Sequence, residues 1–203
     1  MALREILKTS DNLETLRRIS REVEVFDEKL FALLDDLTDT MLKANGVGLA
    51  APQVGILRRA FVISLDGKDF YEFVNPKIIF EKGMQSDEEG CLSIPNQHAY
   101  VKRPRKVIIQ AYDRHGEGFE LTAYDRFAVA VCHEMDHLNG ILYTDKIDTE
   151  LTERMEKKLK NKRKVIEGTE VLTTSSEENA GASNARSNNK NNSSELSSKG
   201  EQT

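Results

Sequence analysis

Residues 127–138 read FAVAVCHEMDHL, an apolar run that leads into two histidines with a glutamate between them. If residues 126–138 form a helix, His133 and His137 lie one above the other on one face, and both imidazoles can reach a single ion. Glu134 lies beside them, where a carboxylate can accept a proton from a metal-activated water without being a ligand. The pattern therefore predicts metal-assisted hydrolysis.

The apolar lead-in distinguishes this motif from a chance match on a solvated helix. Residues 127–132 are apolar on all sides, which predicts a buried helix. Histidine and glutamate are costly to bury unless they are paired or bind an ion. We therefore expect this helix to carry its ionisable groups inward.

Two histidines do not complete such a site, because catalytic sites of this kind use three protein ligands. No histidine follows His137, and the strongest other donor is Cys91. Cys132 is adjacent to His133 and projects about 100° away from it, so we expect it to face the core as a small apolar residue. For Cys91, ligation is the better interpretation beside two histidines, and a plain buried thiol is the alternative.

The rest of the chain predicts a sheet around the motif helix. Residues 27–45 form an amphipathic pattern that predicts a second helix. Strand-like stretches, joined by short loops that favour antiparallel pairing, occupy residues 59–64, 71–80, 106–112 and 118–124. We predict an α+β fold of mostly antiparallel sheets packed around a buried helix that carries the HExxH motif.

A glycine-rich run, GVGLAAPQ at Gly46–Gln53, connects the amphipathic helix to the first strand. Glycine suits a place where the backbone approaches a ligand, and an ordinary helix-to-strand connection is the alternative interpretation. The run lacks the Lys and Ser/Thr of a phosphate-binding loop and the third glycine of a dinucleotide fingerprint. Nucleotide binding is not expected.

Composition and charge narrow the class of protein. The chain has 203 residues, enough for one domain, and its hydrophobic fraction of 38% predicts a polar segment outside the core. Residues 1–148 carry 19 basic and 25 acidic residues, which argues against a general nucleic-acid binder. There is no signal-peptide pattern and no apolar run long enough to cross a membrane. Two cysteines without an export signal predict thiols in a cytoplasmic protein.

The C-terminal part divides in two. Residues 149–166 predict a helix with seven basic and three acidic residues, either a solvated face or a surface for phosphate contacts. Residues 167–203 contain almost no large apolar groups, so we expect a disordered polar tail.

Three segments in this order, Gly46–Gln53 (GVGLAAPQ), Glu89–Ser93 (EGCLS) and His133–Leu138 (HEMDHL), resemble the three signature motifs of the peptide deformylase family. The resemblance implies a metal-dependent hydrolase that removes the N-formyl group from the N-terminal formyl-methionine of newly synthesised proteins and releases formate. It implies a catalytic domain over residues 1–166 that ends in the basic helix.

The resemblance also implies the roles of individual residues. Cys91, His133 and His137 hold one divalent ion, which is Fe²⁺ in the cell, with Ni²⁺, Co²⁺ or Zn²⁺ as alternatives. Glu134 takes a proton from the water and later delivers it to the departing amine. The set is completed by oxyanion donors and a substrate contact: the side chain of Gln53, the backbone N–H of Leu92 and the backbone of Gly48.

Apolar walls for the methionine side chain are expected from Val129, Cys132, His133, Ile94 and residues 46–49. The sequence departs from the family pattern at two positions: Cys132 stands where bacterial members often have glutamine, and His98 where they often have arginine. Imidazole lacks the guanidinium fork, so His98 is expected to weaken contacts with the substrate backbone. Asp136 is expected to pair with Arg103 behind the ligands.

Expected partners are N-formyl-methionyl nascent polypeptides and, through residues 149–166, the ribosome; neither DNA nor a membrane is expected.

Two alternative functions belong to other classes of protein. One is a catalytically silent metal-binding or ribosome-associated module, and it is disfavoured because the sequence contains every residue that the resemblance assigns to the metal and to the reaction. A zinc endopeptidase is the other, and it is disfavoured by the thiolate ligand and by the absence of a later histidine.

Overall fold

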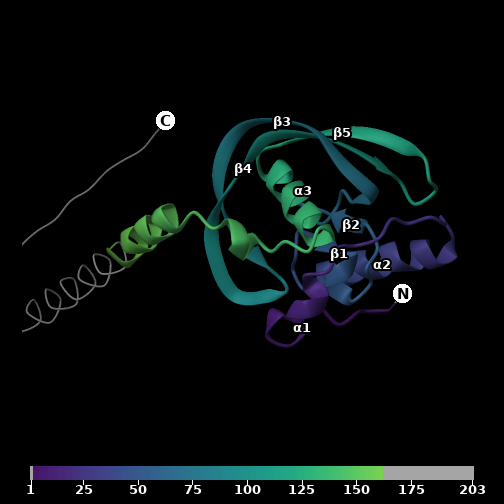
Figure 1. Ribbon diagram of the computed structural model, residues 1–203, viewed down its shortest axis with the longest axis horizontal. Coiled ribbons are helices and arrows are strands. Elements are labelled where there is room, and N and C mark those ends of the chain that lie inside the picture. Colours follow the sequence, from purple (N-terminus) through teal and green to yellow (C-terminus); the bar gives the residue numbers. More distant parts are fainter. Residues whose placement is uncertain (1, 162–203) are drawn as a thin grey trace, which may run out of the picture. The chain divides into compact units, whose positions relative to one another are not determined.

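The computed structural model describes residues 2–161, and Met1–Met155 form one compact unit that contains all the site residues discussed below. The elements in chain order (Figure 1) are α1 (Thr9–Leu16), α2 (Glu28–Lys43), β1 (Gly48–Ala50), the 3-10 turn η1 (Ala51–Val54), β2 (Ala60–Ile63), β3 (Tyr71–Cys91), β4 (Ile94–Tyr112), β5 (Gly118–Tyr124), α3 (Asp125–Leu138) and the 3-10 turn η2 (Tyr143–Lys146).

The five strands form one sheet in the order β1-β2-β3-β4-β5, and every neighbouring pair is antiparallel. The predictions of an α+β fold and of antiparallel pairing are confirmed. The glycine-rich run at residues 46–53 contains a short edge strand followed by η1, where Pro52 occupies a position that needs no backbone donor.

The hairpin of β3 and β4 is much longer than the sequence predicts. The pattern predicted strands that end at residue 80 and begin at residue 106, yet pairing continues to Cys91↔Ile94 around the two-residue turn Leu92–Ser93. The added residues are rich in charged side chains because much of the extension faces solvent, so the alternation of apolar residues is lost there. This extension carries Cys91 to the hairpin tip.

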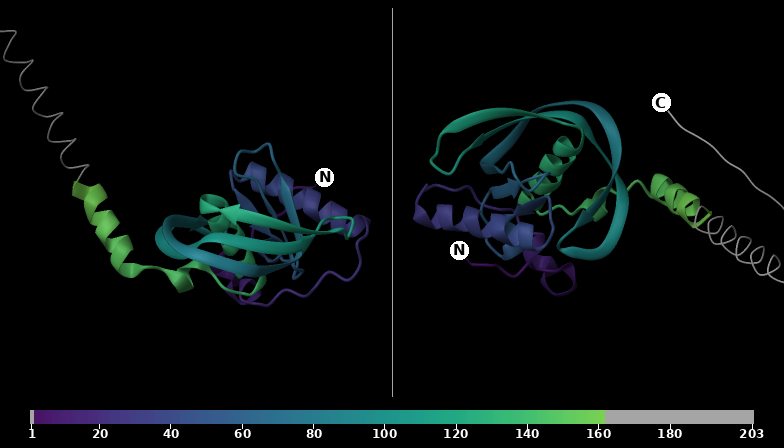
Figure 2. Two further views of the ribbon diagram at one scale, coloured as in Figure 1. Left: turned by 90° about the horizontal axis from the view of Figure 1, so that it is seen from above. Right: turned by 180° about the vertical axis from the view of Figure 1, so that it is seen from behind.

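Two apolar clusters hold the helices in place. The larger cluster lies between α3 and the strands that curve around it (Figure 2), and includes Phe61, Phe73, Ile109 and Val131. A second cluster packs α2 against β1 and β2. Helix α2 begins where the Asp27 carboxylate accepts hydrogen bonds from the backbone of Lys29 and Leu30, close to the predicted start.

The predicted C-terminal helix is present over residues 149–161, and Asp148 accepts a hydrogen bond from the Leu151 backbone at its start. Residues 162–166 of that prediction, and the predicted disordered tail at 167–203, lie outside the described residues. Within residues 2–161, no helix is long and apolar enough to cross a membrane.

Candidate metal centre

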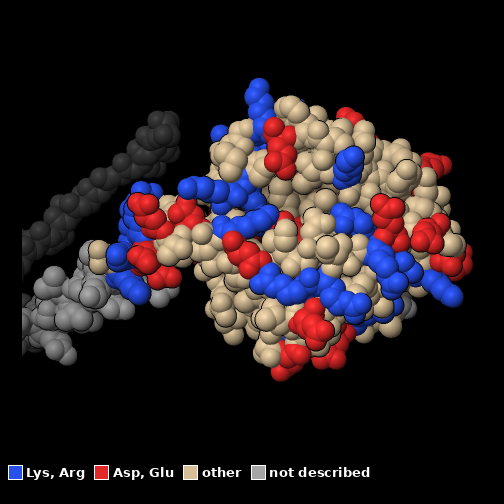
Figure 3. Space-filling view, in the orientation of Figure 1, with Lys and Arg blue, Asp and Glu red and all other residues tan. Residues whose placement is uncertain are grey.

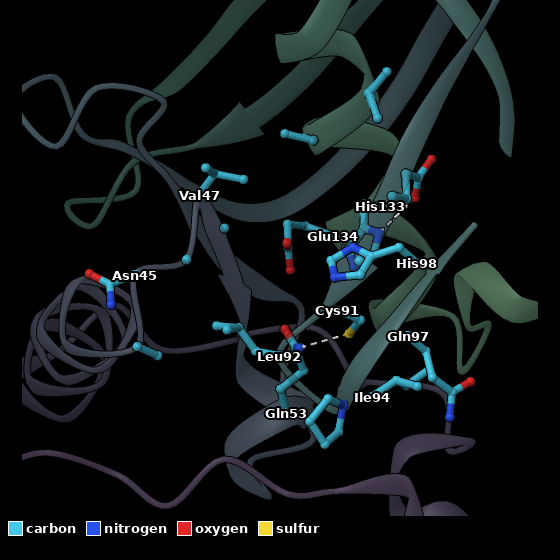
Figure 4. A pocket seen from close by; sticks show the side chains of 18 of the residues that line it. Asn45, Val47, Gln53, Cys91, Leu92, Ile94, Gln97, His98, His133 and Glu134 are labelled. Carbon is cyan, nitrogen blue, oxygen red and sulfur yellow. Dashed lines mark hydrogen bonds and ion pairs between the residues drawn. The ribbon is translucent and has the colours of Figure 1, made fainter. Parts of the chain in front are cut away.

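Three potential ligands from distant parts of the chain meet where the tip of β3 faces α3. The ligand atoms of Cys91, His133 and His137 all lie within 4.8 Å of one another. The Cys91 Sγ lies 3.2 Å from His137 Nε2, and the two imidazole centroids are 5.0 Å apart. The long hairpin and the helical spacing of the histidines together assemble this cluster, of which Figure 4 labels Cys91 and His133.

A pocket of about 580 Å³ opens in front of the cluster. Its lining includes six of the seven site residues expected from the sequence, namely Gly48, Gln53, Cys91, Leu92, His133 and Glu134. The seventh, His137, is buried behind them. Val47, Ile94, Val129 and Ala130 supply apolar wall.

The expectation that Cys132 walls this pocket is wrong. Cys132 is 6% exposed and packs in the cluster between α3 and the sheet, because it projects from another side of α3 than His133 does. Burial raises the pKa of its thiol to about 12, which keeps it protonated. Its expected position as an apolar core residue is confirmed.

Glu134 is buried on α3 and faces the pocket. Its Oε2 has no hydrogen-bond partner among the described protein atoms. Burial raises the pKa of this carboxyl group to about 7, although the neighbouring His133 opposes the rise. A carboxyl group with a pKa near neutrality can both accept and return a proton.

Two glycines allow the three motif segments to approach one another. A Cβ on Gly48 would lie 2.4 Å from Glu134 Oε1, and a Cβ on Gly46 would lie 2.7 Å from Leu92 Cδ1. The first motif therefore contacts the other two with its bare backbone. From the sequence, glycine is expected in this run because the backbone approaches a ligand there. The structure adds a second reason at Gly48: a side chain at this position would collide with Glu134.

Gln53 and Leu92 both lie next to Cys91, Gln53 through its side chain and Leu92 as the next residue of the chain. The Gln53 Oε1 accepts a hydrogen bond from the Ala50 backbone at 2.9 Å. Its Nε2 donates to Ser93 Oγ at 3.2 Å and to Cys91 Sγ at 3.5 Å, the latter drawn in Figure 4. Leu92 forms the first half of the hairpin turn.

A buried ionic network lies behind His133. Glu89 Oε2 lies 2.8 Å from His133 Nδ1, and both Glu89 oxygens accept hydrogen bonds from the Arg103 guanidinium at 2.7 and 3.0 Å. Arg103 also donates to Asp136 at 2.6 Å, which confirms the expected pair, and Lys146 donates to Asp136 at 2.7 Å. Glu89 and Lys146 have no role that the sequence predicts, because the first reaches His133 through the extended β3–β4 hairpin and the second reaches Asp136 of α3 from the turn η2.

The network directs the protons of the imidazoles. Burial alone would raise the pKa of Glu89, but hydrogen bonds from His133 and Arg103 hold it at about 2. As an ionised acceptor, Glu89 keeps a proton on His133 Nδ1 and leaves Nε2 facing Cys91. Burial and the proximity of His133 lower the pKa of His137 well below its usual value, so that imidazole is neutral.

His98 lies opposite Gly90 in the hairpin and lines the pocket. A Cβ on Gly90 would lie 2.7 Å from the His98 imidazole, so the glycine gives this ring its place. The departure at position 98 therefore falls on the pocket wall.

One thiol, two imidazoles and a buried carboxyl group at one pocket of an antiparallel α+β fold form the residue set of a metal-assisted hydrolase. Comparison with known proteins identifies the kind of hydrolase. A model of the family described as polypeptide deformylase matches residues 3–153. The peptide deformylase of Acetivibrio thermocellus is 48% identical over 165 residues, which cover 81% of this chain and 95% of that protein.

Solved structures agree with the sequence comparison. The crystal structure of a peptide deformylase from Legionella pneumophila matches with a TM-score of 0.70 and 41% identity, over 82% of this chain and 98% of the other. A peptide deformylase structure from Acinetobacter baumannii with Met-Ala-Ser bound matches with a TM-score of 0.67 and 33% identity, over 72% of this chain and 99% of the other. The chain belongs to the polypeptide deformylase family, as its three motifs predicted.

Proposed function

We propose that this protein removes the N-formyl group from the N-terminal formyl-methionine of newly synthesised polypeptides and releases formate, using one divalent metal ion. The observation that carries the proposal is the convergence of Cys91, His133 and His137 beside the buried Glu134, at one wall of a pocket. Membership of the polypeptide deformylase family supports the reaction.

The residues present fit a metal ion. Hydrogen bonds with Cys91 and Glu89 raise the pKa of His133 to about 10 in spite of its burial, so this position favours a positive charge. An ion shared with Cys91 and His137 would take the place of the proton that gives the His133 imidazole its positive charge. When bound, a divalent ion supplies a Lewis acid that polarises a carbonyl group and lowers the pKa of water. Fe²⁺ is our choice for the cell, with Ni²⁺, Co²⁺ and Zn²⁺ as alternatives.

The protein's own groups divide the remaining work. Glu134 accepts the proton of the attacking water and returns it to the departing amine, a role that its pKa of about 7 supports. The Gln53 side chain and the Leu92 backbone N–H donate hydrogen bonds to the oxygen on which negative charge develops. The Gln53 amide already points toward Cys91, and its contact with Ser93 Oγ holds it there.

The substrate's methionine side chain occupies the apolar part of the pocket. Ile94, Val47, Val129 and Ala130 wall this space, which is large enough for such a side chain. The Acinetobacter baumannii relative holds Met-Ala-Ser, the tripeptide that removal of a formyl group from formyl-Met-Ala-Ser would leave. We propose that the Gly48 backbone contacts the main chain of the peptide and that His98 contacts it more weakly than an arginine would.

We also propose a cytoplasmic site of action, a catalytic domain over residues 1–166 and a ribosome contact through the basic helix. The described part of that helix, residues 149–161, carries Arg154, Lys157, Lys158 and Lys160. Figure 3 shows basic side chains interspersed with acidic ones over the face that it draws, which suits a local contact more than a broad nucleic-acid surface. Co-sedimentation with ribosomes that persists after truncation at residue 150 would contradict the ribosome contact.

Formate release from formyl-Met-Ala-Ser tests the proposed reaction. Protein purified without oxygen and loaded with Fe²⁺, Ni²⁺, Co²⁺ or Zn²⁺ in separate samples is expected to release formate with at least one of them. Glu134→Ala should retain the metal and lose at least about 100-fold in kcat. A protein that is inactive with every metal, or that digests casein, would overturn the proposal.

A further inference from the structure

Three consecutive residues before and at the start of α1 lie against both segments that carry the proposed oxyanion donors. The Leu7 backbone N–H donates to the Gln53 carbonyl at 2.8 Å, and the Thr9 N–H donates to the Ser93 carbonyl at 3.0 Å. Between them, the Lys8 ammonium donates to the Leu92 carbonyl at 2.5 Å. The N-terminal segment therefore ties η1 to the turn of the β3–β4 hairpin.

The Lys8 contact differs from an ordinary surface lysine contact. Lys8 is half-buried and lines the pocket. Within residues 2–161, no carboxylate forms an ion pair with it, and its ammonium is directed at a neutral peptide carbonyl. Hydrogen bonds with a charged donor are stronger than those between neutral groups, so this contact can fix the orientation of a peptide unit.

The hairpin turn needs such support. The pairing of β3 with β4 shifts register between Gly90 and Cys91, directly before the turn, so the regular ladder does not continue into it. Cys91 holds the turn on the side of the imidazoles, and Thr9 and Gln53 hold Ser93 on the other side. Lys8 is the side chain that holds Leu92 itself.

We propose that Lys8 is a positioning residue for the reaction, which orients the Leu92–Ser93 turn so that the Leu92 N–H points at the developing oxyanion. This inference rests on the proposed function. An oxyanion donor acts only when it lies within hydrogen-bond distance of the position that the charge will occupy, so a small rotation of the turn weakens it. Because the charge exists only in the transition state, the loss of Lys8 lowers kcat and leaves KM nearly unchanged.

Three variants test the inference. Lys8→Met keeps the aliphatic stem and removes the donor, and Lys8→Arg keeps a charged donor. Lys82→Met, at an exposed position on β3 away from the pocket, is the matched control. For Lys8→Met we expect kcat to fall about tenfold with KM within about twofold of wild type, a smaller effect than removing a donor outright. Metal content should not change, Lys8→Arg should recover most of the kcat, and Lys82→Met should behave as wild type.

Amide hydrogen exchange of the metal-loaded proteins gives a readout that does not need activity. In Lys8→Met, exchange at residues 90–94 should accelerate about tenfold, because a charged hydrogen bond that holds the turn is lost. Exchange in β2, residues 60–63, should not change. Acceleration in both regions would mean a general loss of stability and would overturn the inference.

Other outcomes are equally decisive. Unchanged kcat and unchanged exchange in Lys8→Met would overturn the positioning role. A rise in KM alone would mean that Lys8 touches the substrate, and a loss of metal would mean that it supports Cys91; both contradict the inference. If wild type releases no formate, the proposed reaction fails, and the exchange comparison still decides whether Lys8 holds the turn.

Discussion

The region behind His133 and the outer end of the β4–β5 hairpin contain the same kind of cluster, one arginine between two carboxylates. Arg103 joins Glu89 to Asp136, and its side chain is 3% exposed. Arg114 joins Glu72 to Asp35, and its side chain is 28% exposed. Burial, and the next contact of each carboxylate, decide the importance of such a cluster, since of these four carboxylates only Glu89 also contacts a potential metal ligand.

The largest difference is expected from removing each arginine. Arg103→Met removes the guanidinium that the buried Glu89 and Asp136 share and should lower the free energy of unfolding by about 3 to 5 kcal/mol. Arg114→Met, the matched control, removes a partly exposed pair and should cost about 1 kcal/mol or less. Urea unfolding of both variants measures the difference. Equal losses would mean that burial does not separate the two clusters.

The same contrast applies to glycines. Gly48→Ala places a Cβ where Glu134 lies, and Gly118→Ala in β5 meets only ordinary contacts with Tyr112 at 3.7 Å or more. Because Gly48→Ala displaces the proposed base, we expect kcat for deformylation to fall about 100-fold, within the usual contribution of general base catalysis. Gly118→Ala should keep wild-type kcat. A fully active Gly48→Ala would show that Glu134 does not need its present position.

Glu89 contacts a proposed metal ligand and Glu72 does not, so the two carboxylates form a matched pair. Glu89→Gln weakens the acceptor for His133 Nδ1, and loss of such a contact typically lowers metal affinity about 10- to 100-fold. Glu72→Gln should leave metal affinity unchanged. Competition with a chelator measures both variants, and a Glu89→Gln protein with wild-type affinity would remove Glu89 from the metal site.

The smallest expected effect is at the far end of the buried network. Asp136→Asn keeps one acceptor for Arg103 or Lys146 and loses the negative charge between them. We expect a loss of roughly 1 to 3 kcal/mol in stability, with a modest drop in metal content, and no such change in Asp35→Asn. Thermal unfolding and metal analysis provide the test. Full stability, metal content and activity in Asp136→Asn would exclude a supporting role.

The sequence was informative wherever chemistry depends on local spacing. Two histidines one turn apart and an apolar lead-in predicted the position of α3 and the direction of its motif, and the need for a third ligand led to Cys91. The alternating apolar pattern of β5 predicted both of its ends. These features depend on helical or strand periodicity, which can be read without the fold.

The sequence was less informative wherever the site depends on pairing between distant segments. The charged residues of the β3–β4 extension hide its strands, so neither the contact of Glu89 with His133 nor the tip position of Cys91 could be derived. The Lys8 contact joins residues that are 84 positions apart, and no periodicity reports it. For Cys132, the helical spacing correctly predicted a core position. The expectation that it also walls the pocket was inconsistent with that spacing.

One thiolate and two imidazoles of this chain are proposed to hold a single metal ion, and X-ray absorption at the zinc edge of the Zn²⁺-loaded protein measures the neighbours of that ion. We expect one sulfur neighbour at about 2.3 Å and two imidazole nitrogens at about 2.0 to 2.1 Å, the distances typical of zinc. The sulfur signal should vanish in Cys91→Ser and persist in Cys132→Ser. A metal without a sulfur neighbour, or one whose sulfur signal depends on Cys132, would mean that Cys91, His133 and His137 do not form the metal site.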